Sequence, residues 1–209
     1  KDGKFYGLDY HVGAAVIYYN KEILDAAGVD VDSIVSWDDF YKAGKKVLAK
    51  TGKPMTTVES TEHWSFYPLI SQQGSDFLDA NNNGILDNEI NVKTLEFIKK
   101  LVDEKIAVVA PAGFHHSEEY WSFMNNSGAA SVWMPLWYMG RFTSYMPKLK
   151  GKVVVRPLPV WTKGGKRSAG MGGTGTAVTT QSKNLDLAKR FLAYAKGSKE
   201  GSIKTWTIL

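Results

Sequence analysis

The chain has 209 residues, 44% of them hydrophobic and 22% charged, which is typical of a globular protein with one large domain or two small lobes. It contains no cysteine, so disulfides, thiolate metal sites and a cysteine nucleophile are excluded. The 26 Lys and Arg residues outnumber the 21 Asp and Glu residues, but they are scattered, whereas nucleic-acid binding usually needs a concentrated basic face. We therefore expect no nucleic-acid partner. The sequence also has no apolar run near the about 20 residues of a membrane span.

The hydrophobic pattern alternates between strand-like and helix-like segments along the chain. Short β-branched and apolar runs predict strands at residues 5–8, 14–19, 54–58, 129–134, 153–155 and 176–180. Amphipathic spacing and capping residues predict helices at 21–27, 36–50, 64–73, 92–104, 118–126 and 185–195, and another from 198. A polar-aromatic elbow is expected at residues 10–13. The alternation indicates an α/β fold with a largely parallel central sheet and flanking helices.

A glycine-rich segment, Gly170–Gly175, matches the G-x-G-x-x-G spacing of dinucleotide-binding sites. Such a site requires a helix directly after the glycines, but the β-branched run Thr176–Thr180 follows instead. We interpret the glycines as an edge where a ligand approaches backbone amides, with a plain turn as the alternative.

The segment Asp79–Glu89 carries oxygen side chains at the spacing of a calcium-binding loop, with a glycine at its sixth position. Its last acidic residue falls at position eleven, whereas the calcium loop has its glutamate at position twelve. The alternative is a β-hairpin with a tight turn at Asn83-Gly84. The ligands of a structural calcium ion would be Asp79, Asn81, Asn83, the Ile85 carbonyl, Asp87 and Glu89.

No pattern in the sequence predicts catalysis. The acidic pairs Asp38-Asp39 and Glu118-Glu119 fall at predicted helix starts, where carboxylates interact favourably with the helix dipole. No G-x-S-x-G elbow, H-E-x-x-H motif or P-loop occurs in the sequence. We expect a protein that is not an enzyme.

Several spaced motifs resemble extracellular solute-binding proteins of sugar ABC transporters, the group that includes the maltose-binding type. They are Gly3–Leu8, Ala14–Leu24, Ala27–Val29, Ser36–Phe40 and Ala188–Leu192. The resemblance implies a type II periplasmic-binding-protein fold with two α/β lobes that close on ligand. It also implies that a complete member is roughly twice this length. Residues 1–13 would form a first-lobe strand and crossing, 14–158 the second lobe, and 159–209 the return crossing and part of the first lobe.

The resemblance also implies where a sugar binds. Tyr10 and His11 match the family's first crossing, where the family often has a carboxylate and this sequence has none. Glu62 and Trp64 match a loop of the maltose binder, and Trp137 matches a tryptophan that lies under a sugar. Gly172, Gly173 and Thr174 match a glycine-rich segment on the first-lobe side of the cleft. Flat rings would pack against the apolar faces of a sugar while polar groups hold its hydroxyls.

From the resemblance we expect a monomeric carbohydrate-binding protein, with no required cofactor, that delivers a mono- or oligosaccharide to an ABC permease. Its location would be extracytoplasmic, whether periplasmic, at the cell surface or lipid-anchored. The alternative is an extracellular sugar-sensing domain of a signalling system with the same fold.

Overall fold

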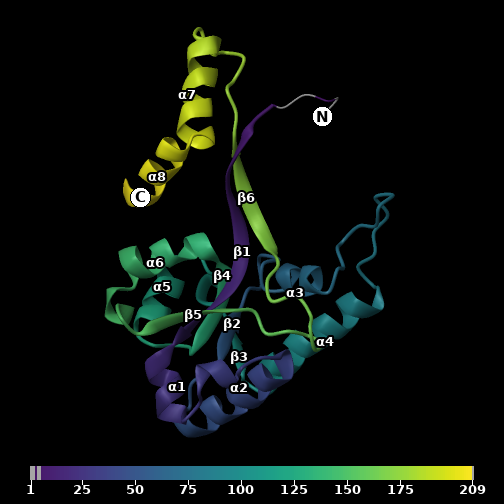
Figure 1. Ribbon diagram of the computed structural model, residues 1–209. Coiled ribbons are helices and arrows are strands. Elements are labelled where there is room, and N and C mark those ends of the chain that lie inside the picture. Colours follow the sequence, from purple (N-terminus) through teal and green to yellow (C-terminus); the bar gives the residue numbers. More distant parts are fainter. Residues whose placement is uncertain (1–2, 4–5, 209) are drawn as a thin grey trace. The chain divides into compact units, whose positions relative to one another are not determined.

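The structure is a computed structural model that describes residue 3 and residues 6–208, with the side chains of residues 10, 12, 205, 206 and 208 excepted. Strands and α-helices follow one another in the order drawn in Figure 1. The strands are β1 (Leu8–Asn20), β2 (Thr56–Val58), β3 (Ala107–Val109), β4 (Ser131–Pro135), β5 (Val153–Pro157) and β6 (Gly170–Thr176). The α-helices are α1 (Lys21–Ala27), α2 (Trp37–Thr51), α3 (Tyr67–Gln72), α4 (Glu89–Asp103), α5 (Glu118–Asn125), α6 (Met139–Tyr145), α7 (Leu185–Gly197) and α8 (Lys199–Ile208). Short 3-10 helices are η1 (Val31–Ser33), η2 (Pro111–Gly113), η3 (Leu136–Tyr138) and η4 (Pro147–Leu149).

The chain divides into two compact units. The larger unit is Ala14–Met171, and the smaller one combines the chain up to Gly13 with the chain from Gly172. The expected second-lobe boundary at residue 158 stays a prediction, and the larger unit itself continues to Met171.

The larger unit is built on a sheet in which β1 lies between β4 and β5. Both pairs are antiparallel, with Ile17 opposite Trp133 on β4 and Arg156 on β5. A separate pair, β2 and β3, is parallel. The expected largely parallel sheet is therefore wrong for the sheet around β1. The alternation of strands and helices predicts that β4 and β5 run in the same direction, and they do. It does not predict that β1, which comes from a distant part of the chain, inserts between them in the opposite direction.

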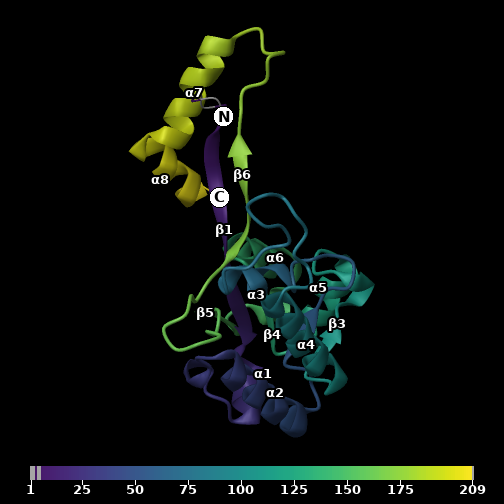
Figure 2. The same ribbon diagram turned by 90° about the vertical axis from the view of Figure 1, so that its right-hand side faces the viewer.

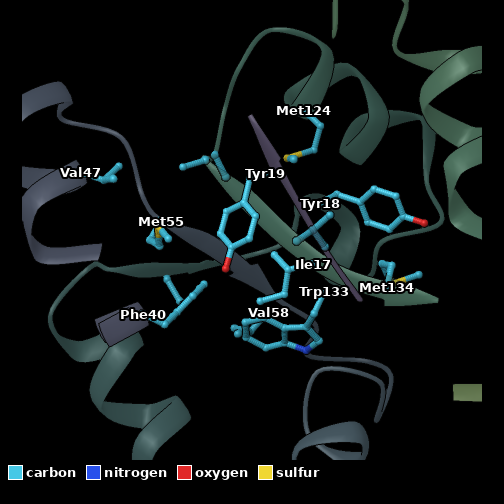
Figure 3. Packing of buried hydrophobic residues seen from close by; sticks show 14 of the residues in the cluster. Ile17, Tyr18, Tyr19, Phe40, Val47, Met55, Val58, Met124, Trp133 and Met134 are labelled. Atoms are coloured by element: carbon cyan, nitrogen blue, oxygen red, sulfur yellow. The ribbon is translucent and has the colours of Figure 1, made fainter. Parts of the chain in front are cut away.

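Buried aromatic and aliphatic side chains fill the space between this sheet and the helices. Figure 3 shows Tyr18 and Tyr19 leaving β1 on opposite sides, as successive strand residues must. Ile17 packs towards Trp133 and Phe40, whose ring centroids are 6.2 Å apart. Trp37, at the first position of α2, is 2% exposed and donates a hydrogen bond from Nε1 to Gln72 Oε1 at 3.0 Å. The core therefore ties α2 and α3 to the sheet.

Two sequence expectations about strands are wrong. The elbow at residues 10–13 is absent because β1 runs without interruption from Leu8 to Asn20, paired with β4 and β5 along its second half and also with β6. The last strand is the glycine-rich segment Gly170–Thr176, and the predicted strand 176–180 shares one residue with it. Pairing with β1 outweighs the low strand propensity of glycine.

Helix starts follow the sequence more closely. Ser36 and Asp39 form the predicted capping box of α2: the Ser36 side chain accepts the Asp39 N–H, and the Asp39 carboxylate accepts the Ser36 N–H. Asn20 and Ser117 cap α1 and α5 as expected. Helix α4 starts three residues earlier than predicted, at Glu89, because Asn88 accepts the Asn91 N–H and acts as its cap.

The smaller unit contains the first part of β1, most of β6, and the helices α7 and α8, which contact each other (Figures 1 and 2). Gly7 lies close to the strand end of β6, since a Cβ atom at Gly7 would be 2.9 Å from the Thr176 carbonyl oxygen. In the described part of the chain no helix has the length and apolarity that crossing a bilayer requires.

Candidate functional site

The carboxyl ends of β2, β3 and β4 meet at one edge of the larger unit. Strands β2 and β3 are parallel, and β4 begins beside the start of β2, where Ala130 N–H donates to the Pro54 carbonyl at 3.0 Å. At the other end, the Tyr138 hydroxyl after β4 donates to the His115 carbonyl after β3 at 2.6 Å. The starts of the three strands lie beside one another, and so do their ends. All three strands therefore run in the same direction. Ligands of open α/β sheets bind outside such carboxyl ends.

Hydrogen bonds join the segments that follow these strands into one surface. The backbone N–H groups of Ser60 and Thr61 donate to the Gly113 carbonyl at 2.8 and 3.2 Å. The backbone N–H of His115 donates to Glu59 Oε1 at 2.9 Å. The segment after β2 is thereby bound to the segment after β3, which Tyr138 joins to the end of β4.

The segment after β2 carries the predicted residues Glu62 and Trp64. Glu62 and His63 are exposed, and Trp64 is half-buried. The His63 ring lies against Trp64 with ring centroids 4.3 Å apart, and Tyr67 meets Trp64 edge-on at 6.4 Å. Trp64 is therefore supported by other rings and keeps part of its surface accessible.

The predicted Trp137 lies in η3, directly after β4, and is 41% exposed. The His116 ring is 5.2 Å from it at an interplanar angle of 32°, and the buried Tyr138 ring is 5.9 Å from it. An exposed ring with a histidine beside it offers a flat apolar face next to a hydrogen-bonding nitrogen. A sugar requires both, because it has an apolar face and a rim of hydroxyl groups.

A buried polar network lies under this edge. The side chains of Glu59 and His115 are each 1% exposed, with His115 Nδ1 3.5 Å from Glu59 Oε1. His115 Nε2 is 3.0 Å from Thr57 Oγ1, which is also 3.0 Å from the Tyr120 hydroxyl. Glu59 Oε2 and His115 Nδ1 have no hydrogen-bond partner among the described residues.

Burial sets the protonation of this network. It raises the pKa of Glu59, while the backbone N–H groups of His115 and Trp64 work against that rise. It lowers the pKa of His115 to about 3, with a smaller contribution from His116. Both shifts favour the uncharged side chains.

We expect His115 to make the fold sensitive to acid. As pH falls from 7 to 5 the unfolded chain protonates His115, near its ordinary pKa of about 6.5, whereas the folded chain does not. The protonation of His115 alone therefore favours unfolding by about 2 kcal/mol over this range. Urea unfolding of the full-length protein at pH 7 and pH 5 measures it.

His115→Gln is expected to remove most of this acid sensitivity. A smaller part stays, because burial also lowers the pKa of His116. The control His63→Gln replaces an exposed histidine and is expected to keep the full effect. Equal acid sensitivity in His115→Gln and the unaltered protein would show that His115 is not the group responsible.

The other predicted sugar-binding residues belong to the smaller unit. His11 is a half-buried residue of β1, and Tyr10 precedes it in the same strand, but its side chain lies outside the described part. Gly172, Gly173 and Thr174 are consecutive residues of β6, and Gly172 has a φ of 76°, a conformation that favours glycine.

The segment Asp79–Glu89 forms a turn between α3 and α4. The Asp79 carboxylate accepts the N–H groups of Asn81 and Asn83 at 2.8 and 2.9 Å, and the Asn83 amide donates to it as well. An antiparallel bridge pairs Leu78 with Gly84, so the chain reverses over Asp79–Asn83, with Asn82 at φ 63°. The tight turn expected at Asn83-Gly84 is therefore placed wrongly, because the Asp79 carboxylate organises the residues before it.

Two further predicted calcium ligands also have other partners in this structure. The Ile85 carbonyl accepts the side-chain amides of Asn88 and Asn91 at 2.7 and 3.0 Å. Glu89 forms an ion pair with Lys93. Within the described residues no group of three or more His, Asp or Glu side chains gathers as a metal site. Calcium binding stays a prediction.

Sequence reasoning missed Glu59, His116 and Tyr138 as parts of the candidate site. A usable signal existed for Glu59, since a carboxylate directly after a buried strand falls at the edge where ligands bind. The adjacent His115 and His116 rings have different partners: Thr57 for His115 and Trp137 for His116. In an irregular segment, adjacency in the sequence does not indicate where two neighbouring side chains point.

Comparisons with known proteins agree with this architecture. The chain matches the family of bacterial extracellular solute-binding proteins over residues 1–201. It is 56% identical over its whole length to an arabinooligosaccharide-binding protein of Bacillus subtilis (strain 168), covering 48% of that protein. It is 53% identical to a protein of the same name from Halalkalibacterium halodurans, covering all of this chain and 47% of that protein.

A solved structure shows the same relationship. The binding protein associated with an ABC transporter of B. animalis subsp. lactis Bl-04, in complex with β-1,6-galactobiose, has a TM-score of 0.78 and 27% identity. The match covers 96% of this chain and 50% of that one. The chain thus spans about half the length of the relatives it matches. By the family match over almost its entire length, the chain belongs to the bacterial extracellular solute-binding proteins.

Proposed function

We propose that this chain is part of a non-enzymatic sugar-binding component of an ABC importer, and that the ligand of this component is an arabinooligosaccharide. The observation that carries the proposal is the exposed Trp137 beside His116, at the edge where β2, β3 and β4 end. The names of the two relatives that are more than half identical support this class of ligand.

The proposed roles follow from the chemistry of a sugar. The apolar C–H face of a sugar ring packs on Trp137, and Trp64 offers a second ring on the segment after β2. His116 and Glu62 supply hydrogen bonds to hydroxyl groups, because an imidazole nitrogen can donate or accept and a carboxylate accepts. The rings give affinity for the sugar faces and the polar groups select the hydroxyl pattern.

We propose that the smaller unit also carries sugar-contacting residues. Tyr10, His11 and Gly172–Thr174 would contact the ligand there, within the expected first-lobe segments 1–13 and 159–209. Exposed apolar side chains of α7, such as Leu187 and Phe191 at 65% and 68%, support its packing against further first-lobe residues. A ligand held by both lobes favours the closed state, in proportion to its greater affinity for that state.

The proposed partner is an ABC permease, to which a monomeric, extracytoplasmic protein presents its closed form. Its anchoring, by lipid or by retention in a periplasm, belongs to the same proposal. The function requires no cofactor, and a structural calcium ion at Asp79–Glu89 is a separate prediction that the sugar chemistry does not need.

Calorimetric titration of the full-length protein tests this proposal. Arabinose, arabinobiose and arabinotriose would be compared with maltotriose and β-1,6-galactobiose. We expect saturable binding of the arabinooligosaccharides with the highest affinity, and no decrease in sugar concentration on prolonged incubation. Folded protein that binds no member of the panel, or that hydrolyses one, would contradict it.

A further inference from the structure

A buried hydroxyl group lies against the turn that carries Trp137. Tyr18, on β1, is 1% exposed. Its hydroxyl oxygen is 2.9 Å from the Pro135 carbonyl oxygen and 2.9 Å from the Leu136 carbonyl oxygen, and these two acceptors share its one proton. The Leu136 carbonyl belongs to the peptide group that joins Leu136 to Trp137. Tyr18 therefore holds the backbone directly before the exposed ring.

The same hydroxyl is also close to the backbone after Trp137. Burial raises the pKa of Tyr18, and the backbone N–H of Met139 works against that rise, so this N–H lies near the hydroxyl oxygen. At the N-termini of η3 and α6, both of which the structure describes, no side chain forms a capping hydrogen bond. The turn is thus held by a residue 117 positions before Pro135, and not by a neighbour in the sequence.

The Tyr18 ring is itself fixed by packing. Its centroid is 5.0 Å from that of Phe142 on α6 and 6.2 Å from that of Tyr138 in η3. The Tyr138 hydroxyl is used elsewhere, because it donates to the His115 carbonyl. Two tyrosines therefore hold the two sides of Trp137: Tyr18 holds the peptide before it, and Tyr138 ties the residue after it to the segment that follows β3.

Trp137 needs support from its backbone because its ring is 41% exposed. A ring with this much exposure has less packing around it than a buried ring, so its position depends on the turn beneath its Cα atom. A ring that is already in its binding position loses little conformational freedom when a ligand binds, and this pre-organisation increases affinity. Loosening the turn would leave the ring able to bind sugar, but less tightly.

We propose that Tyr18 is a positioning residue for sugar binding, whose hydroxyl fixes residues 135–139 so that the Trp137 ring is presented to the sugar. This inference rests on the proposed function. It adds a residue that touches no sugar and acts through Trp137. The contribution of the Tyr18 hydroxyl must therefore disappear when the Trp137 ring is absent.

A double-mutant cycle in the full-length protein, measured by calorimetric titration with arabinotriose, tests this role. Tyr18→Phe keeps the ring and removes only the hydroxyl, and it is expected to weaken binding by roughly 5-fold to 10-fold while one binding site per molecule is retained. In a Trp137→Ala background the same substitution is expected to change the affinity by less than about twofold, because the group through which it acts is missing.

Tyr19→Phe is the matched control. It removes a hydroxyl from an equally buried tyrosine on the opposite side of β1 (Figure 3). We expect this variant to bind arabinotriose like the unaltered protein. Thermal melts of the two variants are expected to show similar, small decreases in melting temperature, because each loses one buried hydroxyl.

The outcomes separate this inference from the proposed function. Binding by Tyr18→Phe within twofold of Tyr19→Phe would overturn the role of Tyr18 alone. An equal loss with and without the Trp137 ring would show that Tyr18 does not act through Trp137, and it would also overturn that role. So would a Tyr18→Phe variant with fewer binding sites per molecule and a melting temperature well below that of Tyr19→Phe, because the loss would then come from unfolding. An unaltered protein that binds no arabinotriose would overturn the proposed function, and this inference with it.

Discussion

Trp137→Ala in the full-length protein is expected to weaken arabinooligosaccharide binding by roughly 30-fold or more, because truncating a tryptophan at the centre of a binding surface typically costs about 2 kcal/mol or more. The ring is 41% exposed, so its loss opens no large cavity and the melting temperature is expected to change little. Calorimetric titration with arabinotriose and a thermal melt measure the two effects.

Two further variants sharpen this prediction. Trp137→Phe keeps a smaller aromatic face and is expected to recover part of the affinity. Leu95→Ala removes an exposed apolar side chain from α4, which carries none of the proposed sugar contacts, and is expected to bind normally. If Trp137→Ala bound as tightly as Leu95→Ala, the ring would not be part of the site.

The second large effect is expected for Glu59→Ala, which lowers the free energy of unfolding by about 2–4 kcal/mol. The substitution removes the acceptor of the His115 N–H and leaves that buried donor unsatisfied, in a network that also loses its packing around the carboxyl group. Glu59 joins the segment that carries Trp64 to the one that carries His116, so the affinity for arabinotriose is expected to fall as well. Urea unfolding and calorimetric titration measure both changes.

Glu59→Gln distinguishes the hydrogen-bonding role of this residue from its charge. The amide oxygen can accept the His115 N–H, and burial already raises the pKa of Glu59, so an uncharged side chain suits the site. We expect stability within about 1 kcal/mol of the unaltered protein. Glu62→Gln changes an exposed carboxylate of the same segment and serves as the stability control. A Glu59→Gln variant as unstable as Glu59→Ala would show that the charge, and not the acceptor, is needed.

The local structure was the most predictable part of the molecule. Ser36 with Asp39, Asn20 and Ser117 mark helix starts through hydrogen bonds to residues two or three positions away, so the sequence contains the whole interaction. The strand directions were less predictable, because β1 pairs with β4 and β5, more than 100 residues later, and no local pattern records that insertion. For the same reason the sequence does not predict the strand at Gly170–Thr176, because its pairing partner, β1, is far away in the chain.

The candidate site was predictable only in part. Trp64 and Trp137 were identified from resemblance and position, and both follow strands that end at one edge of the larger unit. Their surroundings depend on long-range contacts: His116 meets Trp137 across 21 positions, and Glu59 meets His115 across 56. A buried carboxylate and histidine become visible only when the strands that carry them lie side by side.

The crystal structure of the full-length protein with arabinotriose is the most direct test of the central claim. The account predicts one sugar ring facing Trp137, with His116 within hydrogen-bond distance of a hydroxyl, at the edge where β2, β3 and β4 end. A sugar bound elsewhere on the larger unit, with Trp137 and Trp64 both free of contact, would contradict it.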